Sequence, residues 1–176
     1  MNLWDRLQTA LPPGQARILV NLGHLARRKN TGLYLVGGAV RDLLMGRSMQ
    51  TPDLDLVVEG DAIALAHAAS MELRAALSMH KQFGTATLSF ENGASVDLAT
   101  ARTETYKNPG ALPRVQAADT ILQDLARRDF TINAMACSRG RSIISTLDPS
   151  RGGTGSRLKT TSTRFSTMNI YMSHAR

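Results

Sequence analysis

The 176-residue sequence predicts an α/β (α+β) domain in which a mixed β-sheet is flanked by helices. Three observations predict this class. Segments with the 3.6-residue period of a helix alternate with short apolar segments of the length of strands. The pair Asn92-Gly93 separates two segments of alternating polarity, and Asn-Gly is a strong hairpin signal. The resulting order is helix, strand, helix, strand, helix, hairpin and helix, as expected for helices packed on a sheet.

The first helix is expected to begin at Pro12-Pro13, because proline is well tolerated in the first turn of a helix. The apolar residues that recur along it at helical spacing are Ile18, Leu19, Leu22, Leu25 and Ala26. A short apolar strand follows at residues 33–36. Gly37-Gly38 then turns the chain into a short helix over residues 39–45.

The middle of the chain predicts a strand, a helix and the hairpin. Residues 53–58 alternate between polar and apolar and then become fully apolar, as a strand does. Asp61 is placed to cap a long helix, rich in Ala and Leu, that runs to about Met79. The strands of the hairpin are expected at residues 85–90 and 94–101.

The last part of the chain is less regular. Residues 103–116 contain two prolines and are expected to form a loop. Residues 120–135 follow a largely helical period, and residues 141–147 predict a last strand. From Ser150 onward the sequence is rich in Ser, Thr, Gly and Arg, so this tail is expected to be disordered or loosely attached.

The net charge of +7 comes mainly from the C-terminal tail. Residues 139–176 contain seven Arg or Lys and one Asp, whereas residues 1–138 contain fourteen basic and thirteen acidic residues. The part expected to fold is therefore close to neutral. Its overall charge is not an argument for a nucleic-acid-binding face.

The composition favours a protein of the cytoplasm. Cys137 is the single cysteine, which excludes an internal disulfide and fits a reducing compartment. The N-terminal segment lacks the order of a secretory signal, and no apolar run approaches the roughly 18 residues of a membrane span. The four histidines show no zinc-binding spacing, and no membrane partner is expected.

Alternating aspartates begin the second predicted strand. Asp53 and Asp55 point to one face, about 6.6 Å apart along the backbone, and Asp97 alternates with apolar neighbours on the hairpin. If the hairpin pairs beside this strand, the three carboxylates can hold one or two magnesium ions together with substrate phosphates. Solvated aspartates at the mouth of a strand give the same pattern, so the spacing alone leaves both interpretations open.

The Gly-Gly turn before the short helix is a candidate phosphate site. Gly37 and Gly38 leave free N–H groups at the helix start, and Arg41 in the first turn can add a fork of donors to a triphosphate. An ordinary tight turn between strand and helix has the same sequence. A phosphate cradle beside a carboxylate cluster would form a site for nucleotidyl transfer.

A third candidate segment lies at residues 125–136. Arg128 is suited to a second phosphate contact, and Asp129 to orienting a neighbour. At helical spacing Asp129 and Asn133 share one face. An amphipathic helix with a solvated basic first turn explains the same pattern.

In order along the chain, four motifs run from about Leu33 to Ala136, and they read LVGGAVRDLLMG, DLDLVVEGD, VDLATARTETY and DLARRDFTINAMA. Together they resemble the head domain of class II tRNA nucleotidyltransferases and bacterial poly(A) polymerases, the CCA-adding enzymes and their relatives. The resemblance implies a polymerase-β-like nucleotidyltransferase fold. Antibiotic and protein nucleotidyltransferases share such a sheet, but the RRDFTINA segment argues against them. The segments VVEGDA and PGALPRV resemble the sequences of A-adding or multi-domain members more than those of the compact CCA-adding enzymes.

The resemblance also implies roles for individual residues. Asp53, Asp55 and Asp97 would be the catalytic and metal-binding carboxylates of a Mg²⁺ site, in which two metals are expected. The implied nucleotide-binding residues are Gly37, Gly38, Arg41, Arg128, Asp129 and Asn133. The donor would be ATP or CTP, and the acceptor the 3′ end of tRNA or another RNA.

The sequence departs from the family pattern after residues 147–149, where complete members continue into a helical neck. That neck carries an EDxxR motif that reads the base, and no such motif follows Pro149 here. We therefore divide the chain into an N-terminal helical extension (1–32), a nucleotidyltransferase head (33–149) and a disordered or aberrant tail (150–176). The hypothesis is a truncated gene or a reading frame lost near Ser150.

This departure leaves two functions open. The first is an active RNA 3′-end nucleotidyltransferase, and the second is a weak or inactive nucleotide- and RNA-binding remnant of one. Without a neck, the side chains of Phe130, Ile132 and Met135 would be partly exposed. Exposed apolar patches favour association, so a homo-oligomer formed through this surface is expected.

Overall fold

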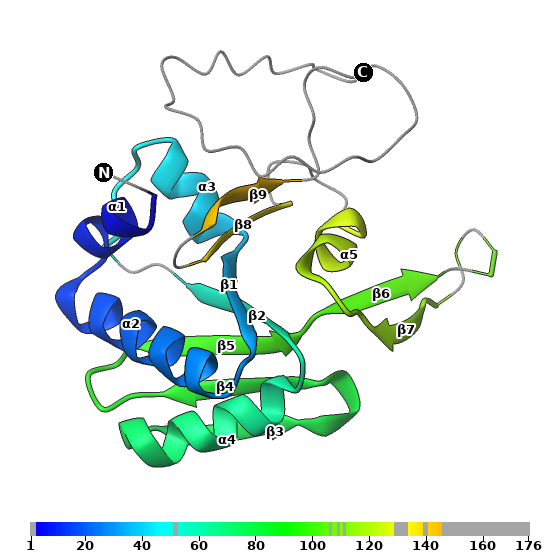
Figure 1. The fold of residues 1–176 in the computed structure, drawn as a ribbon, viewed down its shortest axis with the longest axis horizontal. Coiled ribbons are helices and arrows are strands. Elements are labelled where there is room, and N and C mark those ends of the chain that lie inside the picture. The colour runs from blue at the N-terminus through cyan, green and yellow to red at the C-terminus, as the bar shows by residue number, and fades with distance from the viewer. Residues whose placement is uncertain are drawn as a thin grey trace.

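The computed structural model describes residues 3–50, 53–105, 107–108, 110, 112–128, 134–138 and 141–145. Within these residues a seven-stranded sheet has the order β3-β4-β5-β2-β1-β8-β9, and a separate ribbon pairs β6 with β7 (Figure 1). The helices are α1 (Leu3–Ala10), α2 (Pro13–Arg28), α3 (Gly38–Leu44), α4 (Ala62–Leu73), the 3₁₀ turn η1 (Lys81–Phe83) and α5 (Ile121–Ala126). The strands are β1 (Gly32–Val36), β2 (Leu54–Glu59), β3 (Ala76–His80), β4 (Thr85–Ser89), β5 (Ser95–Thr100), β6 (Arg102–Thr105), β7 (Arg114–Ala117), β8 (Met135–Ser138) and β9 (Arg141–Ser145).

The sheet is mixed, as the sequence predicts. Strands β2 and β5 run parallel, and the other neighbouring pairs of the sheet run antiparallel. The parallel pair arises because the chain leaves β2 through α4 and returns through the β3–β4 pair before entering β5. Parallel neighbours require such a crossover connection. The predicted hairpin is therefore confirmed, and it lies beside the first acidic strand.

Apolar side chains form a core on each face of the sheet. Leu56 packs in the larger cluster with residues of α1, α2 and α4, whereas the next residue, Val57, packs in the smaller cluster with Ile121 and Leu125 of α5. This division follows from the strand period, because successive side chains point to opposite faces. The apolar residues predicted for the first helix are buried in the larger cluster, and these are Ile18, Leu19, Leu22, Leu25 and Ala26.

The helix predicted from Asp61 is shorter than expected. Asp61 caps α4 as predicted, with Oδ1 accepting from the N–H groups of Ile63 at 2.9 Å and Ala64 at 3.0 Å. The helix ends at Leu73, because Arg74 adopts a left-handed conformation with φ 54°. The expectation of helix to Met79 is wrong. The following residues form β3, whose backbone groups pair with β4.

The prediction of an irregular loop over residues 103–116 is also wrong in part. Residues predicted to be irregular form β6 and β7, with Thr103 opposite Gln116 and Glu104 opposite Val115. Figure 1 shows this ribbon extending away from the main sheet. Every residue of β7 is exposed, so the segment lacks the apolar alternation by which a half-buried strand is recognised.

The last predicted helix covers only part of its segment. Helix α5 begins after Thr120 as expected but ends at Ala126, and Met135 begins β8 instead of ending a helix. Strand β8 pairs with β1, with Leu35 opposite Cys137. The backbone of β1 thus decides the conformation of a segment whose local pattern favours a helix. The predicted last strand is confirmed as β9 in its described residues.

No helix in the described residues is long and apolar enough to cross a membrane. Met135, one of the three side chains expected to be partly exposed, is half-buried and packs against the larger core cluster. The other two, Phe130 and Ile132, lie outside the described residues, as does the tail.

Substitutions of Arg74 test the early end of α4. Glycine adopts φ 54° without strain, so we expect Arg74→Gly to raise the free energy of unfolding by up to about 1 kcal/mol. Arg74→Val places a β-branched residue in the left-handed region and should lower it by about 1–2 kcal/mol. Urea unfolding measures both. If the helix continued through this position, glycine would instead destabilise by about 1 kcal/mol.

Candidate nucleotidyl-transfer site

The parallel register of β2 and β5 places two carboxylates side by side. Asp55 is the direct partner of Asp97, and each alternates with buried apolar residues of its strand. Both therefore emerge on the face opposite the larger core. On the other side of Asp97, Thr87 of β4 is its register partner, and Thr87 Oγ1 donates to Asp97 Oδ1 at 2.5 Å. The expectation that the hairpin pairs beside the first acidic strand is confirmed by the register of Asp55 with Asp97.

Asp55 lies in an environment that disfavours its ionised form. Partial burial raises the pKa of its carboxyl, and the neighbouring charges of Asp97 and Asp53 raise it further, while Arg128 opposes the shift. Asp53 itself is exposed and precedes β2. The negative charge of Asp55, which lies near two other carboxylates and is only partly compensated, would be stabilised by a bound cation.

The donor set fits a magnesium ion that is completed by a substrate. Carboxylate oxygens are the ligands that Mg²⁺ prefers, and it usually takes one or two of them together with phosphates. Among the described residues no three acidic, histidine or cysteine side chains converge into a complete metal cage. Asp55 and Asp97 thus offer part of a coordination shell, and phosphate oxygens and water would supply the rest.

A cavity of about 380 Å³ opens beside these carboxylates. Its polar lining includes Asp55, Asp97, Thr85 and Thr87 from the strands and Arg128 from the segment after α5. The cavity therefore combines two carboxylates with a guanidinium, as a substrate carrying both phosphates and a bound cation requires.

The Gly-Gly turn lies next to the same carboxylates. Gly37 has φ 71° and ψ −139°, and a Cβ atom added there would lie 3.5 Å from Asp55 Oδ2. The turn thus combines a backbone conformation that favours glycine with close approach to Asp55. Gly38 begins α3.

Arg41 takes a different orientation from the one its sequence position suggests. Its Nε donates to Asp42 Oδ1 at 2.9 Å and its Nη2 to Asp42 Oδ2 at 3.1 Å. This fork of hydrogen bonds lowers the pKa of the Asp42 carboxyl. Arg41 does not line the cavity that contains Asp55. The structure therefore brings Gly37 to the carboxylates and turns the guanidinium of Arg41 to Asp42.

Asp124 is a residue of the site region that the sequence interpretation missed. It is buried, with 1% of its surface exposed, and it accepts hydrogen bonds from the side chains of Arg127 and Arg128. The spacing contains the signal, because residues three and four positions apart meet on one side of a helix. Asp129 and Asn133 lie outside the described residues, so their predicted roles stay predictions.

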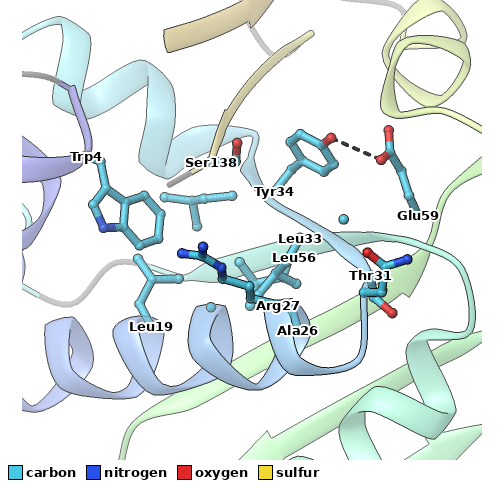
Figure 2. Close-up of a pocket in the computed structure, with 14 residues that line it drawn as sticks. Trp4, Leu19, Ala26, Arg27, Thr31, Leu33, Tyr34, Leu56, Glu59 and Ser138 are labelled. Atoms are coloured by element: carbon cyan, nitrogen blue, oxygen red, sulfur yellow. Dashed lines mark hydrogen bonds between the residues drawn. The ribbon is translucent and has the colours of Figure 1, made fainter. Parts of the chain in front are cut away.

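A larger pocket, of about 560 Å³, lies between α1, α2, β1 and β8 (Figure 2). Among the described residues that line it, Glu59 is the one carboxylate, and both of its oxygens accept hydrogen bonds. Tyr34 donates its hydroxyl to Oε2 at 3.0 Å, and the backbone N–H of Ile121 donates to Oε1 at 2.7 Å. The described lining of this pocket contains no carboxylate pair, so the smaller cavity is the candidate site.

A mixed sheet with carboxylates on adjacent parallel strands, beside a Gly-Gly turn, defines a head domain of the nucleotidyltransferase class. The chain belongs to the poly(A) polymerase head domain family, whose model matches residues 33–155. The resemblance predicted from the four motifs and the polymerase-β-like fold are both confirmed.

Known relatives are similar over the same region. The A-adding tRNA nucleotidyltransferase of Halalkalibacterium halodurans is 42% identical over 77% of this chain and 31% of its own length. The apo form II structure of a CCA-adding enzyme is 40% identical, with a TM-score of 0.70, over 77% of this chain and 31% of that one. The Thermotoga maritima CCA-adding enzyme in complex with tRNA is 37% identical, with a TM-score of 0.63, over 77% and 29%. The chain thus spans about a third of the length of these relatives.

The two glycines of the turn form a matched pair for mutagenesis. Gly37→Ala forces a side chain into a conformation that is nearly restricted to glycine, so we expect a loss of about 1–3 kcal/mol in the free energy of unfolding. In Gly38→Ala the new Cβ makes an ordinary contact, 3.5 Å from Arg41 Nη2, and the change should stay within about 0.5 kcal/mol. Equal losses in chemical denaturation would contradict the assigned backbone geometry.

The raised pKa of Asp55 predicts a pH-dependent gain from its removal. In the folded state ionised Asp55 is disfavoured, so it begins to destabilise the fold as the pH rises above 3.8 and does so fully once the pH exceeds its raised pKa. We therefore expect Asp55→Asn to raise Tm at pH 7 by about 1–3 °C, with the gain fading as the pH falls and vanishing below the ordinary value of 3.8. Differential scanning calorimetry across pH measures this.

The control for this pH series is Glu91→Gln, which removes one charge from the exposed β4–β5 turn. It should leave Tm nearly unchanged across the same pH range. A Tm of Asp55→Asn that lies below that of the wild-type protein at pH 7 would show that the carboxylate is compensated in the fold.

Proposed function

We propose that this chain acts as the head of an RNA 3′-end nucleotidyltransferase, which adds AMP or CMP from ATP or CTP to an RNA. The observation that carries the proposal is the pairing of Asp55 with Asp97 in one cavity with Arg128. Metal-binding carboxylates and a cation that faces them meet the demands of a reaction in which pyrophosphate leaves.

The reaction is an in-line displacement at the α-phosphorus. The 3′-hydroxyl oxygen of the RNA forms a bond to the α-phosphorus of the nucleotide, and the bond from that phosphorus to the bridging oxygen breaks. Asp97, whose carboxylate accepts a hydrogen bond from Thr87, would accept the proton of the attacking hydroxyl, and pyrophosphate would leave with the bridging oxygen. Mg²⁺ held by Asp55 and Asp97, with Asp53 as the further ligand that the family motif predicts, would neutralise the charge of the phosphates.

The donors for the triphosphate come from the elements around the carboxylates. Arg128 lines the cavity and can pair with phosphate oxygens. We assign the N–H groups at Gly37 and Gly38 to the same ligand. Arg41 would have to exchange its bonds to Asp42 for bonds to phosphate. Asp129 and Asn133 complete the nucleotide-binding set that the family motif predicts.

We propose tRNA as the acceptor, in the cytoplasm. One relative is named an A-adding tRNA nucleotidyltransferase, and the structure of another was solved with tRNA bound. The chain matches about a third of these proteins. The residues that read the base belong to the neck of complete members, so we expect a head domain alone to transfer nucleotides weakly and with little selectivity.

Incorporation of labelled ATP and CTP tests this function. Each nucleotide is offered separately, with Mg²⁺, to tRNA that ends at the discriminator base, at C and at CC. We expect incorporation by the wild-type protein and a loss of about 100-fold or more in Asp55→Asn, since a carboxylate that binds the metal stabilises the transition state by several kcal/mol. The calorimetry described above shows whether this variant is folded.

The result separates the two functions that the sequence leaves open. A wild-type protein that is folded and binds ATP without incorporating it would support the binding remnant and contradict the transferase. Incorporation that persists in Asp55→Asn would remove the carboxylates from the mechanism. Glu91→Gln serves again as the control, because its charge lies on an exposed turn outside the cavity lining.

A further inference from the structure

We propose that Asp124 is a positioning residue that holds the guanidinium of Arg128 toward the candidate site. Asp124 lies on α5 and is buried, with 1% of its surface exposed. It does not line the cavity that contains Asp55 and Asp97, whereas Arg128 does. Any influence of Asp124 on a bound nucleotide therefore acts through Arg128.

The two oxygens of Asp124 have separate partners. Oδ2 accepts from Arg128, with Nε at 3.2 Å and Nη2 at 2.9 Å. Oδ1 accepts from Arg127, with Nε at 3.1 Å and Nη2 at 2.8 Å, and also from the backbone N–H of Arg102 at 3.2 Å. Each arginine thus uses two donors on one oxygen, which fixes the direction of its guanidinium as well as its distance.

The surrounding contacts hold the carboxylate in place. Arg127 Nη1 also donates to Glu104 of β6 at 2.9 Å, and Glu104 pairs with Arg102 at 3.2 Å. Asp124 is therefore tied through both arginines to the residues that follow its own helix, and to β6 through the backbone of Arg102. With its partners fixed in this way, the carboxylate can hold Arg128 in one orientation before a substrate arrives.

The buried charge itself favours a positioning role over a stabilising one. A buried ion pair recovers little net stability, because removing both charges from water offsets most of their attraction. Such a cluster has a larger effect on the orientation of its side chains than on the free energy of unfolding. Here the oriented side chain is a guanidinium that lines the cavity of Asp55 and Asp97.

Asp124→Asn is the informative variant because it keeps the shape of the side chain. One oxygen becomes an amide N–H₂ group, which cannot accept from a guanidinium. The remaining oxygen can serve Arg127 together with the Arg102 N–H, or Arg128, but not both sides. Arg127 and the Arg102 N–H both require the oxygen that remains, whereas Arg128 is a single partner. We therefore expect the oxygen to stay with Arg127 and Arg102, so that Arg128 loses its acceptor.

The matched control is Glu104→Gln, which makes the same chemical change one contact away. Within this cluster of described residues, Glu104 pairs with Arg127 and Arg102, whereas Arg128 pairs with Asp124. It should leave ATP binding within about twofold of the wild-type value. Equal losses in the two variants would show that the cluster acts as a structural unit and would overturn the specific role of Asp124.

ATP binding in a double-mutant cycle is the decisive experiment, and it rests on the proposed function. We expect Asp124→Asn to raise the Kd for ATP about 10-fold, as expected for the loss of a contact to a charged group. In an Arg128→Ala background the same substitution should change Kd less than about twofold. A merely structural role would give the full loss in both backgrounds, and that result would overturn the proposal.

A second measurement keeps the proposal testable if Asp124→Asn does not fold. In the wild-type protein the Nε–H of Arg128 should exchange slowly with solvent, because it donates to a buried oxygen. NMR of ¹⁵N-arginine-labelled protein measures this exchange, and Arg128→Lys assigns the signal. Rapid exchange would overturn the proposal. A protein with slow exchange that binds no ATP would contradict the proposed function alone.

Discussion

The parallel pairing of β2 with β5 is the constraint on which the rest of the site depends. It brings Asp55 and Asp97, which are far apart in the chain, to adjacent positions on one face of the sheet. The crossover through α4 and the β3–β4 pair makes this parallel arrangement possible. A shift of β5 by one residue would turn Asp97 into the apolar core and Leu98 out of it. Burial of that core therefore also fixes the register that places Asp97 beside Asp55.

The electrostatics of the site follow from this pairing. Neighbouring carboxylates and partial burial raise the pKa of Asp55, and Arg128 offsets part of that effect. The fold therefore maintains negative charge at a position where it does not favour stability. A substrate complex with its cation relieves this charge, and such local conflict between stability and binding is common at functional sites.

Much of the fold and part of the site could be predicted from local sequence. The apolar period of α2, the hairpin at Asn92-Gly93 and the alternation of Asp97 are all local signals, and the structure confirms them. The end of α4 at Arg74 could not be predicted, because neither glycine nor proline marks it and pairing of β3 with β4 decides it. The orientation of Arg41 toward Asp42 depends on rotamers that the sequence does not specify.

The sequence by itself determined the class of the domain, its family and the residue types at the site, because periodicity and short motifs are properties of neighbouring residues. Only the tertiary structure decided which of these residues meet. It placed Asp55 beside Asp97, continued the chain after α4 as a strand, and buried Asp124 between two arginines. These outcomes depend on strand pairing and burial between distant segments, which local patterns do not encode.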